Sequence, residues 1–192
     1  MCHNAGMESF SLVNQFLIAM PNMVDPLFSR SVIYLCEHGK QGAMGLVINK
    51  PSGVALAQLF KEIDLPLQLD ALRASSVLFG GPVQPDRGFV LHMPVCSWQS
   101  SLLVTDEIAL TTSKDVLTAV SAGEGPQRIL VTLGYASWAS GQLEEEIARN
   151  AWLNVPCVPH ILFDLPAEER YAASAALLGF DLSLLSSEIG HA

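Results

Sequence analysis

The chain has 192 residues, of which 50% are hydrophobic and 15% are charged, and its 10 Lys and Arg against 19 Asp and Glu give a formal net charge of −9. This balance excludes an intrinsically disordered chain, because such chains combine low hydrophobicity with high charge. No uninterrupted apolar run approaches the roughly 20 residues that a transmembrane helix needs.

The length and the N-terminal sequence predict one cytoplasmic domain. The length favours a single domain over residues 7–192, with two closely packed lobes as the alternative, and Met7 offers a second start that makes residues 1–6 a dispensable, disordered tail. A secretory signal places basic residues before its apolar stretch, whereas the first basic residue here, Arg30, follows the apolar run 16–20. We therefore expect a cytoplasmic protein with no membrane association.

In chain order, the first half of the sequence predicts mainly β-structure. The expected elements are a buried strand at 16–20, two strands at 31–38 and 43–49 that form a hairpin, and a helix at 54–63. The hairpin is indicated by β-branched and aromatic residues on both sides of a turn from Gly39 to Gly42. The helix is indicated by apolar residues at positions 56, 59, 60 and 63, which share one face at 3.6 residues per turn.

The second half alternates strands with helices. The expected elements are strands at 76–79, 87–93, 102–105, 108–111, 128–134, 152–155 and 160–163, and helices at 113–121, at 140–150 and from Pro166 to Gly179. Thr112 and Asp115 have the spacing of a capping box, and Ser140 is expected to cap the helix that it begins. Hairpins mixed with strand–helix steps are typical of an α+β fold with a mixed sheet.

The distribution of charge disfavours direct nucleic-acid binding. No two of the ten basic residues are closer than ten positions, whereas nucleic-acid-binding proteins usually carry a basic cluster or stripe. Folding can still gather Lys40, Lys50 and Arg87 on one face, but the net negative charge opposes long-range attraction to DNA or to an anionic membrane. The acidic run Glu144 to Glu146 is interpreted as the first turn of a helix, where negative charge complements the helix dipole.

No local motif specifies a reaction or a cofactor. The spacings of a Walker loop, a dinucleotide fingerprint and a hydrolase nucleophile elbow are all absent. Cys36 and His38 share one face of a predicted strand, which allows a thiolate–imidazole pair, although such a cysteine is more often a small buried hydrophobe. Cys157 and His160 have the spacing of half a zinc site without a matching second half. We expect reduced cysteines, no metal, no cofactor and no catalytic residue.

Two polar loops are the candidate binding sites. In the first, Gly80 and Gly81 allow close backbone approach, and two prolines stiffen the segment that presents Asp86 and Arg87. A stiff connection with a local ion pair explains this loop in structural terms, and an Arg87 that faces an anionic group explains it in functional terms. The second loop is Asn49–Lys50, which follows the hairpin and which also has a simple interpretation as a strand end.

Many segments together resemble the AlgH/YqgE family of bacterial proteins. The matching segments are 16–21, 31–38, 42–51, 79–83, 86–92, Gly134–Tyr135, Trp138, 141–144 and 150–152. The likeness covers almost the whole chain from about Met7. Ser137 and Ala139 depart from the glycine-rich pattern that usually follows Gly134–Tyr135 in that family.

The resemblance implies an α+β fold with a mixed, branched and partly curled sheet and flanking helices, but it implies no reaction. The family's name reflects a regulatory role proposed in alginate production, for which the label transcriptional regulator is often used. The sequence carries no helix-turn-helix pattern to support that label.

The leading hypothesis is a non-enzymatic regulatory or binding protein that contacts a protein partner or a small ligand. The alternatives are a regulator that contacts DNA directly and a small hydrolase or transferase that uses His38 or His92 with Asp86 or Glu37. The candidate ligand- or partner-binding residues are Asn49, Lys50, Gly80, Gly81, Asp86, Arg87 and Trp138.

Overall fold

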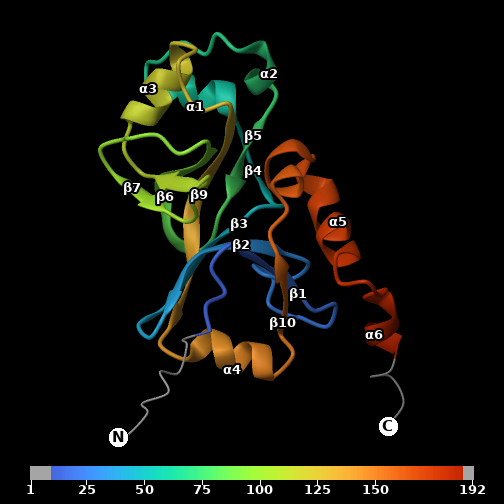
Figure 1. Cartoon of the computed structure of the whole chain (residues 1–192). Coiled ribbons are helices and arrows are strands. Elements are labelled where there is room, and N and C mark those ends of the chain that lie inside the picture. Colours follow the sequence, from blue (N-terminus) through green and yellow to red (C-terminus); the bar gives the residue numbers. More distant parts are fainter. Residues whose placement is uncertain (1–9, 188–192) are drawn as a thin grey trace, which may run out of the picture.

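A branched, mixed β-sheet organises the protein (Figure 1). The computed structural model describes residues 10–187, so the predicted tail at 1–6 and the alternative start at Met7 lie outside the described residues. The ten strands are β1 (Gln15–Ala19), β2 (Val32–Gly39), β3 (Gly42–Val47), β4 (Pro51–Ala55), β5 (Ser76–Phe79), β6 (Val83–Met93), β7 (Ser101–Leu103), β8 (Ala109–Thr111), β9 (Arg128–Ala139) and β10 (Trp152–Pro156).

Strand β9 joins the two halves of the sheet. The main path runs β10–β1–β2–β3–β9–β6–β8–β7, and a branch pairs β9 with β5 and β5 with β4. Neighbouring strands are antiparallel except β5 and β9, which are parallel. The first part of β9 pairs with β6, whereas its last residues, Ala136 to Ala139, pair with β3. The predicted α+β fold with a mixed and branched sheet is confirmed.

Short helices cover the ends and one side of the sheet. They are α1 (Leu56–Glu62), α2 (Asp70–Arg73), α3 (Asp115–Ser121), α4 (Gln142–Ala148), the π-helix η1 (His160–Asp164), the 3-10 helix η2 (Ala167–Glu169), α5 (Arg170–Ala176) and α6 (Ser183–Ser187). Figure 1 shows α1, α2 and α3 together at one end of the molecule and α4 at the other. Among residues 10–187, no helix has both the length and the apolar character that crossing a membrane requires.

Three clusters of buried side chains pack on the sheet. One joins both halves of the sheet to the C-terminal helices and includes Phe16, Tyr34 and Leu91. Another lies under α4 and includes Trp138 and Trp152, and the third lies under α1 and α3. The sheet itself continues from one half to the other through β9. The prediction of one domain over 7–192, or of two packed lobes, stays a prediction.

Several predicted elements differ from the structure in kind or length. Strand β6 begins at Val83 rather than Arg87, and α5 covers only Arg170–Ala176 of the helix expected from Pro166 to Gly179. The segment from His160 is a π-helix rather than a strand, and the bond between His160 Nδ1 and Asp164 Oδ2 at 3.2 Å needs the helical spacing of four residues. The strand expected at 128–134 continues to Ala139, because Gly134 adopts a φ of +75° within the strand instead of ending it.

The predicted helix caps are also wrong. The Ser140 hydroxyl donates to the Lys40 carbonyl at 2.6 Å, and Gly141 occupies the N-cap position of α4. The Thr112 hydroxyl bonds Ser100, and Lys114 occupies the N-cap position of α3. In both cases the hydroxyl has a long-range partner, which a sequence pattern of nearest neighbours does not reveal.

Candidate functional site

A cleft beside Arg87, referred to below as the Arg87 cleft, opens over the sheet and encloses about 490 Å³. Its walls come from β2, β3, β6, β9 and the β7–β8 ribbon. The lining residues are Glu37, Met44, Gln84, Arg87, Phe89, Ser100, Ser101, Leu102, Leu110, Thr112, Tyr135 and Ser137. Small-molecule sites in proteins usually measure about 300–1,000 Å³, so the size suits a small ligand.

A β-bulge places Arg87 on the wall of this cleft. The pairing of β6 with β9 passes from Val83 opposite Tyr135 directly to Gly88 opposite Leu133. The four residues from Gln84 to Arg87 therefore leave the ladder, and Gln84 takes a φ of +47°. A bulge of this kind re-aims side chains without breaking the sheet.

The Arg87 guanidinium contacts neutral groups rather than a carboxylate. Its Nη1 donates to Gln84 Oε1 at 3.2 Å, and its central carbon lies 5.7 Å from the centre of the Phe89 ring. Within residues 10–187, Arg87 forms no ion pair with a carboxylate. An exposed guanidinium positioned in this way can donate a fork of N–H groups to a planar anion.

The other walls offer hydroxyl groups and aromatic rings. Phe89 and Tyr135 pack edge to face with ring centres 5.4 Å apart, and Ser100 Oγ lies 2.9 Å from Thr112 Oγ1. Ser137 lines the same cleft. The combination of one cation, several hydroxyls and an aromatic wall is suited to an anionic ligand that also has an apolar or planar part.

Asn49 and Lys50 lie away from the Arg87 cleft and hold the loop that precedes β2. Asn49 Oδ1 accepts from the backbone N–H of Val32 at 2.8 Å, and its amide donates to the carbonyl of Arg30 at 2.8 Å. Lys50 Nζ donates to the carbonyl of Leu27 at 2.7 Å, and partial burial lowers the pKa of its amine. These bonds give both residues a role in loop structure, and their binding role stays a prediction.

Gly80 and Gly81 are buried against β9, and Asp86 points to solvent. A Cβ atom at Gly80 would lie 2.3 Å from the Gly134 carbonyl oxygen, and one at Gly81 would lie 2.1 Å from the carbonyl carbon of Tyr135. The close backbone approach expected of this pair is thus made to β9. Asp86 is exposed and is not among the residues that line the Arg87 cleft.

Trp138 belongs to a separate cluster around Glu146. Glu146 Oε2 accepts from the indole N–H of Trp138 at 2.9 Å and from that of Trp152 at 2.8 Å, and the two rings are nearly perpendicular. The helix dipole expected for the acidic run from Glu144 to Glu146 does not account for these two bonds. The signal in the sequence is a pair of tryptophans that flank a short helix containing a glutamate.

The structure does not bring the seven predicted binding residues together, because Gly80 and Gly81 pack on β9, Asp86 is exposed and the other four lie in three separate places. Arg87 lies on its cleft, Asn49 and Lys50 hold the 25–31 loop, and Trp138 lines another cleft of about 460 Å³ with Glu146. Ser137 lines both this cleft and the Arg87 cleft, so the two are neighbours along β9.

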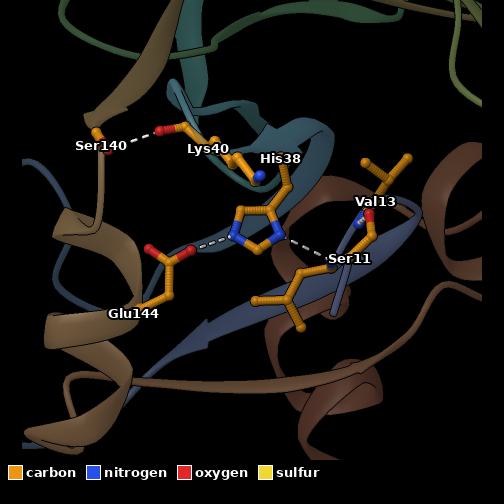
Figure 2. Close-up of polar contacts among 7 residues, drawn as sticks. Ser11, Val13, His38, Lys40, Ser140 and Glu144 are labelled. Carbon is orange, nitrogen blue, oxygen red and sulfur yellow. Dashed lines mark hydrogen bonds and ion pairs between the residues drawn. The ribbon is translucent and has the colours of Figure 1, made fainter. Parts of the chain in front are cut away.

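His38 is fixed by two hydrogen bonds at the start of α4 (Figure 2). The backbone N–H of Leu12 donates to Nδ1 at 3.0 Å, so Nε2 carries the proton and donates to Glu144 Oε1 at 2.7 Å. The backbone N–H of Glu144 and the bond from His38 hold the pKa of this carboxyl below its usual value. The pairing of His38 with Glu37 or Asp86, which the enzymatic alternative requires, is therefore wrong.

His92 is fully buried and has structural partners on both nitrogens. Nδ1 lies 3.0 Å from the Pro94 carbonyl and therefore donates, which leaves Nε2 to accept from the Thr111 hydroxyl at 2.9 Å. Ser101 Oγ continues this chain at 2.6 Å from Thr111. The ring also packs against Trp98. No carboxylate pairs with His92 among the described residues, and the expected pairing with Asp86 or Glu37 is wrong here as well.

The buried His92 predicts a loss of stability between pH 7 and pH 5. Burial lowers the pKa of His92 below its ordinary value of 6.5, so in this range the unfolded chain binds more protons than the folded chain. The free energy of unfolding should fall as the pH drops below the unfolded pKa, by at most about 1.4 kcal/mol per pH unit for one such group. Urea unfolding at pH 7, 6 and 5 should show a weaker pH dependence in His92→Gln, and equal slopes would refute the prediction.

The described cysteines are free, and two of them are poor nucleophiles. Burial raises the pKa of the Cys36 thiol, and it raises the pKa of Cys157 to about 12. A register shift in β2 between Leu35 and Glu37 lets Cys36 enter the core, while His38 bonds Glu144. The thiolate–imidazole pair considered from the sequence is not formed.

Comparison with known proteins finds relatives that match nearly the whole chain. The profile of the AlgH-like family matches residues 16–183. A UPF0301 protein of Chromobacterium violaceum is 68% identical over 186 residues, which cover 97% of this chain and 100% of the relative. One from Burkholderia vietnamiensis is 56% identical over 187 residues, which cover 96% of this chain and 97% of the relative.

Two solved structures share the fold. The solution structure of the AlgH protein from Pseudomonas aeruginosa is 51% identical, covers 100% of both chains and has a TM-score of 0.76. A crystal structure from Corynebacterium diphtheriae has a TM-score of 0.72 over 92% of both chains at 21% identity, which is a likeness of fold alone.

Proposed function

The chain belongs to the AlgH-like family, and on that premise we propose that it is a non-enzymatic, cytoplasmic binding protein that holds a small anionic ligand in the Arg87 cleft and acts in regulation. The observation that carries this proposal is the Arg87 guanidinium, which lies on the wall of a cleft of about 490 Å³ and forms no ion pair within residues 10–187. A cation that lacks a carboxylate partner in a ligand-sized cleft favours an anionic ligand.

The surroundings of Arg87 further narrow the ligand class. Hydroxyl groups of Ser100, Thr112 and Ser137 add hydrogen-bonding capacity to one site, and the Phe89–Tyr135 pair adds an aromatic wall. Glu37 on the same wall disfavours a ligand with several negative charges. A small monocarboxylate with a planar body satisfies these groups best.

The alternatives receive less support. Both candidate catalytic histidines already use both ring nitrogens in bonds to the protein, and a general base must reach a substrate proton. Direct contact with DNA has to overcome the net charge of −9. Binding of a small ligand, followed by contact with a protein partner, requires neither a histidine that is free to act as a base nor electrostatic attraction to DNA.

We predict that Arg87→Ala weakens the retention of a small anion. A charge-assisted hydrogen bond is worth about 1.5–3 kcal/mol, so its loss should weaken binding by about 10- to 100-fold. The purified chain would be equilibrated with a metabolite extract of bacterial cells, passed through an ultrafilter, and the retained compounds would be identified by mass spectrometry. Arg87→Lys, which keeps the charge but loses the planar fork, should retain the same compound less well.

Arg73→Ala provides the matched control. Arg73 is an exposed arginine in α2 that pairs with Asp70 three residues away, at 3.2 Å, and it lies outside the Arg87 cleft. This variant removes the same charge from the chain and should retain the compound fully. If wild type retains no anion, or if Arg87→Ala and Arg73→Ala retain the same compounds equally, the proposed function is wrong.

A further inference from the structure

A third cleft lies between the C-terminal helical segment and the branch of the sheet that contains β4 and β5. It is referred to below as the Arg170 cleft and encloses about 440 Å³. Its lining residues are Pro51, Ala74, Ser75, Ser76, Leu78, Leu130, Phe163, Asp164, Leu165, Pro166, Ala167, Glu168 and Arg170. The cleft shares no lining residue with the Arg87 cleft, so the two can be tested separately.

The Arg170 guanidinium is buried beside this cleft without a carboxylate partner. Arg170 is only 7% exposed, and it forms no ion pair with any of residues 10–187. Nε donates to the Leu165 carbonyl at 3.1 Å, and Nη1 donates to the Ile48 carbonyl at 2.5 Å. Buried charges in proteins are normally paired, because an unpaired charge is costly to remove from water.

One nitrogen of Arg170 is left for a ligand. Nη2 donates no hydrogen bond within the described part of the chain, and it is not among the fully buried polar atoms that lack a partner. It therefore keeps some contact with solvent, and Arg170 is one of the residues that line the cleft. Burial lowers the pKa of Arg170 to about 10, so the guanidinium is still charged near neutral pH.

The neighbouring groups favour a singly charged anion. Asp164 is already paired with Arg128 at 3.1 Å and with His160 at 3.2 Å. Glu168 is exposed, and its charge acts on Arg170 through space. Ser75 and Ser76 line the same cleft, and their hydroxyls form no hydrogen bond within residues 10–187. A doubly charged phosphate would meet stronger repulsion from Glu168 than a carboxylate would.

We propose that the Arg170 cleft binds the carboxylate group of a small molecule, with Arg170 Nη2 and the hydroxyls of Ser75 and Ser76 as hydrogen-bond donors. Leu78, Leu130 and Phe163 provide apolar surface for the rest of that molecule. The site is distinct from the Arg87 cleft and does not depend on the function proposed for it. It gives the protein a second small-molecule site on the opposite branch of the sheet from β2 and β3.

The test is an NMR titration of the full ¹⁵N-labelled chain with acetate, benzoate and inorganic phosphate in turn. Acetate and benzoate should shift the backbone amide resonances of Ser75, Ser76, Leu165 and Glu168 in a saturable manner, with benzoate binding more tightly. The same shifts should occur in the Arg87→Ala chain, because that substitution lies outside this cleft. Phosphate should bind more weakly than acetate.

Ser76→Asp tests the site without removing any hydrogen bond of Arg170. It places a carboxylate inside the cleft and should weaken benzoate binding at least tenfold. Ser97→Asp, at an exposed serine outside the cleft, should bind benzoate as wild type does. Arg170→Lys should also weaken binding. Absence of saturable shifts, equal benzoate affinity in wild type and Ser76→Asp, or tighter binding of phosphate than of acetate would each overturn the proposal.

Discussion

Replacing Gly134 with alanine is expected to destabilise the protein by more than about 3 kcal/mol. Gly134 has a φ of +75° in the middle of β9, and a Cβ atom there would lie 2.2 Å from the carbonyl oxygen of Gly81 and 3.0 Å from that of Val83. Both neighbours are backbone atoms, so neither can rotate away. The strand would have to separate from the segment that leads to Arg87, and urea unfolding should show the loss directly.

Gly123→Ala is the control that separates crowding from backbone strain. Gly123 also has a φ of +75°, but a Cβ atom there would meet nothing within 4 Å. A non-glycine residue in the left-handed region costs about 1–2 kcal/mol by itself, and Gly123→Ala should lose only that amount. Equal losses for the two variants would show that close packing of β9 against Gly81 is not what requires glycine at 134.

Replacing Glu146 with alanine is expected to cost about 2–4 kcal/mol, because it removes the acceptor of two buried indole N–H groups at once. Trp138 is 6% exposed and Trp152 is 2% exposed, and both donate to the same oxygen of Glu146. Urea unfolding followed by tryptophan fluorescence should report both the lower stability and the changed surroundings of the rings.

Two variants on α4 make this prediction specific. Glu145→Ala removes an exposed neighbouring carboxylate from the same helix and should change stability by less than about 0.5 kcal/mol. Glu146→Gln keeps an oxygen for the indoles but turns an amide toward Gln142, whose Nε2 donates to Glu146 Oε1 at 3.0 Å in the wild type. The loss of stability in Glu146→Gln should lie between the losses in Glu145→Ala and Glu146→Ala. Equal stability of Glu146→Ala and Glu145→Ala would contradict the assigned role.

The sequence predicts the sheet best where neighbouring residues determine the structure. The hairpin from Ser31 to Asn49 is recognisable from β-branched residues on both sides of a glycine turn, and β2 and β3 confirm it. At Gly134 the same reasoning predicts the wrong strand end, because a glycine inside a strand has the same local pattern as a glycine that terminates one. Its actual role depends on Gly81, which is more than fifty positions earlier and contacts it only in the folded sheet.

The candidate site could be predicted only in part, for a similar reason. The sequence identifies Arg87 on a stiff polar segment, and the structure places Arg87 on a cleft wall. The other walls come from β2, β3, β9 and the β7–β8 ribbon, whose approach depends on sheet topology. Asn49, like Arg87, is a polar residue in a polar segment beside a predicted strand, yet its amide is used by backbone groups at 30 and 32. Side-chain type alone does not distinguish these two outcomes.

The most direct measurement is an NMR spectrum of the ¹⁵N-labelled arginine side chains while the small-anion fraction of a bacterial cell extract is added. If the Arg87 cleft holds an anion, the Arg87 Nε–H resonance should shift and saturate, and that of Arg73, which already pairs with Asp70, should stay in place. An unchanged Arg87 resonance, or equal shifts of Arg87 and Arg73, would contradict the assignment of this cleft as an anion-binding site.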